Sequence, residues 1–143
     1  MTVIAWDGKT LAADKLACRG SIIEITTKLY EGRGGYALSF AGEAPKGMAM
    51  VKWFNDGAKP EEWPKFQKDD DFVTLVCASR EEVVVYFDQP EPLSFDNKFN
   101  AWGAGSPYAI GAMAAGKSAR EAVEIANNHC CDCGMGVDSV ELK

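Results

Sequence analysis

The sequence lacks the features of nucleic-acid-binding, membrane-spanning and exported proteins. Its 21 acidic residues outnumber 15 basic ones, which form no cluster, and the net charge of -6 disfavours binding to phosphate backbones and to anionic membranes. No apolar run approaches the roughly 20 residues that span a bilayer. Asp7 and Lys9 interrupt the first apolar stretch, and no basic segment precedes it, as a signal peptide would require. We expect a cytoplasmic protein that binds neither nucleic acid nor membranes.

The residues that commonly build metal sites are also few. The single histidine, His129, is followed by Cys130, Cys131 and Cys133, and Cys130 and Cys133 have the C-x-x-C spacing. No second C-x-x-C or H-x-x-x-H completes a tetrahedral zinc site, so we favour reduced, unbonded thiols over a zinc site or a redox pair. His129 is expected at a helix end, where a cation suits the helix dipole. We predict that the protein uses no metal and no cofactor.

Apolar runs and turn residues predict a single domain over residues 1–143. The length and the 47% hydrophobic content suit one buried core. Asp7-Gly8 lies between apolar runs at 3–6 and 9–14, which predicts a β-hairpin whose turn residues tolerate positive φ, with Thr2 directly before its first strand. Further strands are expected at residues 21–27, 36–41, 72–78, 82–87, 98–102 and 139–142.

Three helices are expected between these strands. Ala44-Pro45 opens the first, which Gly57 closes. Ser106 is expected to cap the second, at residues 107–116, and a capping box of Ser118 and Glu121 begins the third. Residues 59–71 are predicted to be a solvated loop. The mixed order of strands and helices indicates an α+β fold in which helices cover antiparallel sheet.

A threonine at the start of a strand suggests a specific chemistry. An N-terminal threonine can act as nucleophile and base together, because its own α-amine takes the hydroxyl proton directly or through a water. A nearby cation lowers the pKa of that amine by like-charge repulsion, and a shift of about one unit from about 8 suffices at neutral pH. A lysine held charged by a carboxylate would supply the cation, and a backbone N–H would stabilise the oxyanion.

Several short segments occur in an order that resembles proteasome β-subunits, most closely the bacterial HslV-type peptidases and short phage-encoded proteasome-like proteins. The likeness extends over most of the chain and is weakest at residues 59–71. The ordered set is specific, although no single motif is. The segments are Thr2-Val3-Ile4-Ala5-Trp6-Asp7-Gly8, Leu11-Ala12-Ala13-Asp14, Thr27-Lys28-Leu29-Tyr30, Phe40-Ala41-Gly42 and Gly103-Ala104-Gly105-Ser106-Pro107-Tyr108.

The resemblance implies a four-layer αββα sandwich of the N-terminal-nucleophile hydrolase class, and it implies roles for individual residues. Thr2 would be the nucleophile after removal of Met1, which is expected before a small residue. Lys28 would tune the threonine amine, and Asp14 would pair with Lys28. Gly42 would give a backbone N–H to the oxyanion hole. Asp132, before a glycine-containing turn, is the best match for an acidic residue that supports the threonine; in relatives that turn also binds a cation through carbonyls.

The resemblance also implies a threonine endopeptidase with a polypeptide substrate, in a homo-oligomeric ring that an ATP-dependent unfoldase feeds. One position departs from the pattern, because Ala104 stands where the family has serine between two glycines near the threonine amine. Three alternatives therefore stay open. They are a catalytically silent ring subunit, a small thiol- or metal-binding module built on residues 129–133, and a self-contained amidase acting on small amides.

Overall fold

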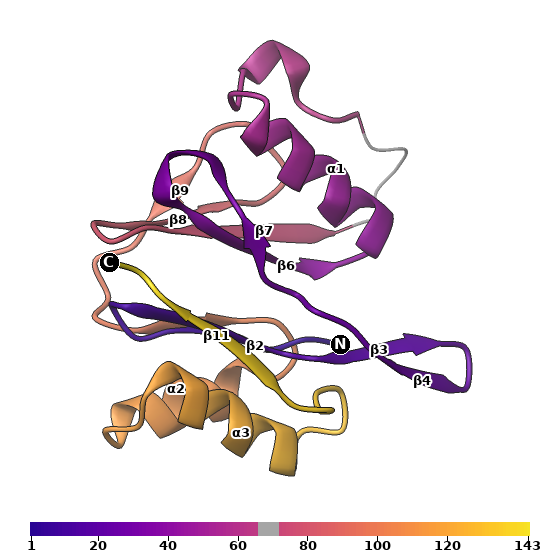
Figure 1. Cartoon of the computed structure of the whole chain (residues 1–143), viewed down its shortest axis with the longest axis vertical. Helices are drawn as coiled ribbons and strands as arrows, with labels where there is room; N and C mark the ends of the chain where they lie inside the picture. The colour runs from indigo at the N-terminus through magenta and orange to yellow at the C-terminus, as the bar shows by residue number, and fades with distance from the viewer. Residues whose placement is uncertain (66–71) are drawn as a thin grey trace.

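The computed structural model describes residues 1–65 and 72–143 and has four layers (Figure 1). One inner layer is an antiparallel sheet in the order β10-β1-β2-β11. The other inner layer is an antiparallel sheet in the order β5-β6-β7-β8-β9. The strands of the first sheet are β1 (Ile4–Trp6), β2 (Thr10–Asp14), β10 (Asn100–Trp102) and β11 (Val137–Glu141), and those of the second are β5 (Tyr30–Glu31), β6 (Ala37–Gly42), β7 (Val73–Ala78), β8 (Val83–Tyr86) and β9 (Leu93–Ser94).

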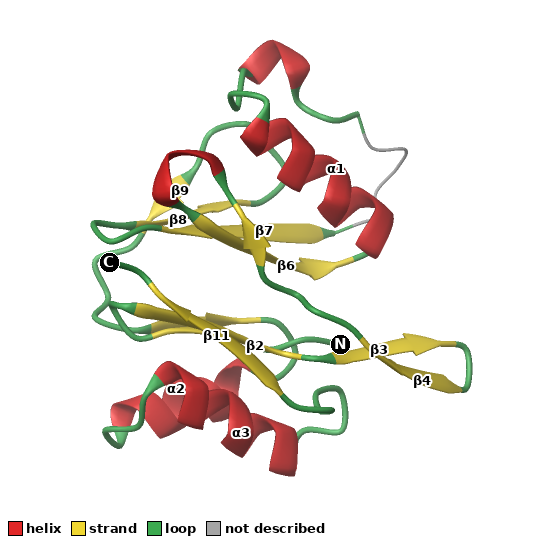
Figure 2. Cartoon of the chain, viewed as in Figure 1, coloured by secondary structure: helices red, strands yellow, loops and turns green. Residues whose placement is uncertain are grey.

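Helices form the two outer layers (Figure 2). Helix α1 (Ala44–Asn55) lies on the five-stranded sheet, whereas α2 (Ser106–Ala114) and α3 (Ala119–His129) lie side by side on the four-stranded sheet. The predicted αββα sandwich is therefore confirmed. A further hairpin of β3 (Leu16–Arg19) and β4 (Ile22–Ile25) projects sideways from the sandwich.

Alternation of side chains along the first two strands builds the core on both faces of their sheet. Val3 and Ala5 pack with Ala12 beneath α2 and α3, whereas Ile4 and Leu11 point the other way, into the cluster between the two sheets. This is the period of two that a strand imposes. Because both faces are covered, the register that pairs Ile4 with Ala13 is fixed firmly.

The turn of the first hairpin differs in one respect from the prediction. Only Gly8 has a positive φ, of 100°. The Asp7 carboxylate instead accepts hydrogen bonds from the backbone N–H groups of Lys9 and Thr10, at 3.1 and 2.8 Å, and from that of Ala119 at 2.8 Å. Asp7 thus shapes the turn through its side chain and joins the hairpin to the start of α3.

The predicted capping box of α3 is confirmed, because Ser118 and Glu121 exchange hydrogen bonds between side chains and backbone N–H groups. The predicted cap of α2 is wrong. Gly105 is its N-cap, without a side-chain hydrogen bond, and Ser106 is already helical. Pro107 fits the first turn of α2 whether Ser106 or Gly105 is the N-cap. The sequence pattern therefore could not distinguish these two starting positions of the helix.

Three strands were not predicted, and one loop is only partly described. Strands β3 and β5 were not expected, and β9 lies in a stretch predicted to be a loop. Of the expected loop at residues 59–71, residues 59–65 include a 3-10 turn at Pro60–Glu62, and residues 66–71 lie outside the described part. Within the described residues no helix is both long and apolar enough to cross a membrane.

Candidate active site

The β1–β2 hairpin brings the start of the chain beside Asp14. Thr2 lies two residues before β1, and Asp14 is the last residue of β2, where its N–H donates to the Val3 carbonyl at 3.2 Å. Thr2 is held on its other side by the Gly105 N–H, which donates to the Thr2 carbonyl at 3.1 Å. Only 7% of Thr2 is exposed. Backbone hydrogen bonds to Thr2 and to Val3 therefore fix the start of the fold.

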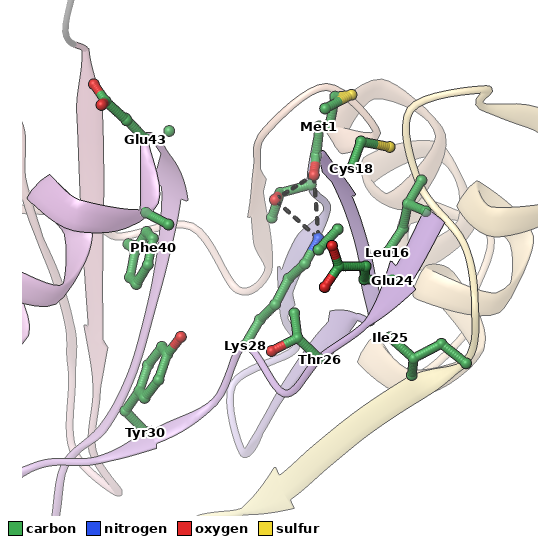
Figure 3. A pocket seen from close by; sticks show the side chains of 14 residues that line it. Met1, Leu16, Cys18, Glu24, Ile25, Thr26, Lys28, Tyr30, Phe40 and Glu43 are labelled. Carbon is green, nitrogen blue, oxygen red and sulfur yellow. Dashed lines mark hydrogen bonds between the residues drawn. The ribbon is translucent and has the colours of Figure 1, made fainter. Parts of the chain in front are cut away.

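Lys28 places a cation between these two residues. Its amino group donates to Asp14 Oδ1 at 2.8 Å. It also donates to Thr2 Oγ1 at 3.1 Å and to the Met1 carbonyl at 3.1 Å (Figure 3). Lys28 is 8% exposed. The structure thus brings Thr2, Asp14 and Lys28, which are far apart in sequence, into one buried hydrogen-bonded cluster.

The Asp14 carboxylate is fully buried and surrounded by donors. Besides Lys28, it accepts hydrogen bonds from the backbone N–H groups of Val3 at 3.1 Å, Leu16 at 3.3 Å and Gly134 at 3.1 Å. A buried charge is tolerated only when it is paired and its remaining lone pairs are satisfied. Asp14 meets both conditions, and its three backbone donors fix the direction from which it holds Lys28.

The Thr2 hydroxyl also contacts the residue before it. With Met1 present, Thr2 Oγ1 donates to the Met1 carbonyl at 2.6 Å, so both Lys28 and Thr2 point at that oxygen. The Thr2 nitrogen is an amide in this form and cannot accept a proton. Met1 itself is 59% exposed, so its peptide bond to Thr2 lies at the mouth of the site.

A cavity of about 530 Å³ opens in front of Thr2 and Lys28. Figure 3 shows Tyr30, Phe40 and Glu43 along one wall, opposite residues of the β3–β4 hairpin. Gly42 lines the same cavity and has a φ of +125°, and a Cβ there would lie 2.3 Å from the Phe72 carbonyl oxygen. Only glycine fits this position without strain. The structure therefore brings predicted residue Gly42 to the cavity of Thr2.

Asp132 is not brought into the cluster. Its half-buried side chain makes none of the hydrogen bonds that hold Thr2, Asp14 and Lys28 among the described residues. The turn that contains Asp132 contributes through its backbone instead, by the Gly134 N–H. The expectation of an acidic side chain from this turn beside Thr2 thus has no counterpart in the geometry.

The segment around Ala104 packs closely on Thr2, as the resemblance implied. A Cβ on Gly103, whose φ is +94°, would lie 2.3 Å from the Thr2 carbonyl oxygen. Ala104 itself is exposed and brings no hydroxyl to this segment, and Ser106 is the first helical residue of α2. Gly103 is therefore required on steric grounds, whereas the hydroxyl that the resemblance implied at position 104 is absent.

The segment at residues 129–133 forms no metal centre in the described structure. His129 ends α3, as predicted, and its ring lies parallel to that of Tyr108 with centroids 6.3 Å apart. No group of three metal-ligating side chains is found among residues 1–65 and 72–143. All five cysteines lie within these residues and are free thiols.

Sequence reasoning missed two groups that support the cluster. Ser39, fully buried in β6, donates its hydroxyl to the Lys28 carbonyl at 2.7 Å and so fixes the backbone of the lysine. A lone serine within the apolar run at residues 36–41 was the available signal, because a buried hydroxyl needs a partner. The Gly134 N–H had no such signal, since every residue except proline carries one.

Comparisons with known proteins identify the fold but find no closely related sequence. No protein-family model matches the sequence, and no curated protein matches it. Among solved structures, Thiobacillus denitrificans BPH has a TM-score of 0.71 at 24% identity, covering 99% of this chain and 98% of that one. Its complex with epoxomicin has a TM-score of 0.71 at 20% identity, with the same coverage. Eukaryotic HslV from Trypanosoma brucei has a TM-score of 0.73 at 19% identity, covering 100% and 99%. The chain therefore has the proteasome β-subunit or HslV-type fold.

Proposed function

We propose that this protein is a threonine endopeptidase that uses Thr2, freed by removal of Met1, to hydrolyse peptide bonds. The observation that carries the proposal is the buried contact of the Lys28 amino group with Thr2 Oγ1 at 3.1 Å and with Asp14 Oδ1 at 2.8 Å. A structural ion pair alone would not need a hydroxyl at the start of the chain as its third member. The adjoining cavity supplies room for an extended peptide.

In the proposed mechanism, the free Thr2 amine accepts the hydroxyl proton, directly or through a water, while Oγ1 attacks the peptide carbonyl carbon. The Lys28 ammonium keeps this amine unprotonated by charge repulsion and stabilises negative charge on Oγ1. The Gly42 N–H stabilises the oxyanion. The amine then protonates the leaving nitrogen, and water, activated by the same amine, hydrolyses the ester to regenerate Thr2.

The Thiobacillus denitrificans structure with epoxomicin supports ligand binding on this fold and suggests the probe. The native protein should first be weighed intact to determine whether Met1 is absent. It should then be incubated with epoxomicin or a peptide bearing a threonine-directed electrophile. We expect one adduct on the native protein and none on Thr2→Ala. Unmodified native protein that lacks Met1, or modified Thr2→Ala, would contradict the proposal.

We further propose that the chain assembles into a homo-oligomeric ring enclosing Thr2 and that an ATP-dependent unfoldase delivers polypeptide to it. The support is the likeness over 99–100% of the chain to structures that include HslV. Native mass spectrometry tests the ring. A monomer at all concentrations would remove the ring and the enclosed chamber while leaving Thr2 chemistry to be tested on short peptides.

A silent ring subunit is the second candidate, and Ala104 favours it. The missing serine hydroxyl removes a group that, in the family, assists proton transfer at the threonine amine. Ala104→Ser decides between slow catalysis and none. If the protein is a slow peptidase, the substitution raises peptide hydrolysis above the native rate. A silent subunit shows no hydrolysis with either residue and no adduct at Thr2.

A further inference from the structure

The turn after α3 holds two thiols in contact. Cys130 follows the last residue of α3, and the Cys133 N–H donates to the Cys130 carbonyl at 3.4 Å, closing a four-residue turn. Such a turn keeps its end Cα atoms within about 7 Å, inside the range that a disulfide bridges. Both side chains pack against the same apolar cluster beneath the four-stranded sheet. The Cys133 thiol also interacts with the Cys130 side chain, which contributes to its raised pKa.

The turn is joined to the proposed active site by two short connections. Gly134, the residue after Cys133, donates its N–H to Asp14 Oδ2 at 3.1 Å and accepts from the Lys15 N–H at 3.0 Å. On the other side, the Cys133 sulfur lies against Gly105, where an added Cβ would be 2.7 Å from it. Gly105 in turn donates to the Thr2 carbonyl. A movement of Cys133 therefore reaches both Asp14 and Thr2.

The two thiols differ in their access to a reagent. Cys130 is half-buried, whereas Cys133 is only 6% exposed. Burial is the main cause that raises the pKa of the Cys133 thiol to about 12, and its contact with Cys130 and the charge of Asp14 add to the effect. Thiolates are the reactive form, so Cys130 is the thiol that reacts first.

We propose that Cys130 and Cys133 form a reversible disulfide that regulates the site at Thr2; the regulatory part rests on the proposed function. The oxidant is a small-molecule disulfide such as glutathione disulfide. The Cys130 thiolate attacks one of its sulfurs and releases one thiol, giving a mixed disulfide. Cys133 then attacks the Cys130 sulfur, its proton passing to the departing second thiolate. Two protein thiols are oxidised and one disulfide is reduced to two thiols.

The expected consequence is a less active oxidised form. A disulfide draws the two sulfur atoms to about 2.0 Å, which pulls Cys133 away from Gly105 and moves Gly134. The hydrogen bond from the Gly134 N–H to Asp14, one of three from the backbone, then lengthens or breaks. The Asp14 carboxylate no longer holds the Lys28 amino group in the same position. Small displacements of catalytic groups reduce rates strongly, by up to about 100-fold for 1 Å. We expect at least a tenfold fall in peptide hydrolysis, of the order set by such displacements.

The test treats the native protein with glutathione disulfide and follows peptide hydrolysis, non-reducing intact mass and peptide mapping. We expect a species lighter by two hydrogens, a Cys130–Cys133 link, the fall in rate, and recovery of both with dithiothreitol. Cys131→Ser, which removes the exposed neighbour, should respond like the native protein. Cys130→Ser should hydrolyse peptide but lose the response.

Four results would overturn the proposal. They are no internal disulfide, a link through Cys131, a disulfide without a change in rate, or inhibition that persists in Cys130→Ser. The last would assign the effect to another thiol, such as exposed Cys18 in the cavity wall. If the reduced protein hydrolyses no peptide, the proposed function has failed separately, and amide exchange at Gly134 decides the coupling. Faster exchange in the disulfide form supports it, and unchanged exchange refutes it.

Discussion

The first two hairpins of the chain are built alike and buried very differently. Every residue of β1 is buried, and β2 is buried except at its first residue, because helices cover one face of their sheet and the second sheet covers the other. In β3 and β4 only Leu16 is buried, and Ile22, Ile23 and Ile25 are 47–62% exposed. The buried hairpin carries Thr2 and Asp14, whereas the exposed one forms a cavity wall.

This difference indicates which parts of the chain fix the positions of the reacting groups. The reacting groups extend from a hairpin fixed on both faces, and Lys28, which follows the exposed hairpin, is fixed separately by Ser39 on β6. The base of the exposed hairpin is joined to the end of β2 by two hydrogen bonds, from the Leu16 N–H to the Asp14 carboxylate at 3.3 Å and from the Thr26 N–H to the Lys15 carbonyl at 2.9 Å.

The largest effect is expected from Lys28→Ala. Removing the lysine leaves the Asp14 carboxylate buried without its counter-ion, which costs about 3–5 kcal/mol of unfolding free energy, and peptide hydrolysis should be lost. Urea denaturation and a peptide assay measure the two effects. Lys52→Ala, which removes an exposed pair with Asp56, is the matched control and should leave both unchanged. A native-like stability for Lys28→Ala would show that water already reaches Asp14.

A comparison of isoleucines tests the two hairpins directly. Ile4 in β1 is fully buried between the sheets, and Ile4→Ala should reduce the unfolding free energy by about 2–5 kcal/mol because it leaves a cavity. Ile23 in β4 is 61% exposed, and Ile23→Ala should change the unfolding free energy by less than about 0.5 kcal/mol. Urea denaturation of dilute protein measures both. Equal losses would mean that the second hairpin is covered in solution, as in an assembly.

Two glycine substitutions should change the stability of the fold in opposite directions. Gly103→Ala places a Cβ 2.3 Å from the Thr2 carbonyl oxygen at a φ of +94°, and it should destabilise the fold by about 1–3 kcal/mol. Gly111 lies in α2 with no other atom within 4 Å of an added Cβ. Gly111→Ala should therefore stabilise by about 0.5–1 kcal/mol through helix propensity. Thermal unfolding distinguishes them, and a neutral Gly103→Ala would refute the close approach.

Much of the fold could be predicted because its signals are local. The Ser118 and Glu121 capping box, the Asp7-Gly8 turn and the mostly apolar strand at 72–78 each depend on neighbours within a few residues. Strand β3 could not be predicted, because its sequence Leu-Ala-Cys-Arg shows no alternation when most of the strand is exposed. Its partner β4 was found from three isoleucines, although they face solvent rather than a core.

The candidate site was predictable only where the type of a side chain indicates its chemical role. Thr2, Lys28 and Asp14 have the residue types that the chemistry demands, and they meet in the structure. Asp132 was chosen because it is the acidic residue in the late turn, yet the turn acts there through the Gly134 backbone, which no residue type reveals. Its supporting role stays a prediction: Asp132→Asn should reduce hydrolysis less than Asp14→Asn, and equal losses would assign Asp132 a part in catalysis.

The smallest effect concerns an exposed hydrogen bond on the five-stranded sheet. Tyr36 donates its hydroxyl to Glu82, and this bond raises the pKa of Tyr36 to about 12. In the unfolded chain tyrosine ionises near pH 10, so the contribution to stability is complete below about pH 10 and is lost as the pH rises towards 12. Urea midpoints at about pH 9 and 11 should therefore fall more for the native protein than for Tyr36→Phe or Glu82→Gln. An equal fall in all three would show that water competes successfully for this bond.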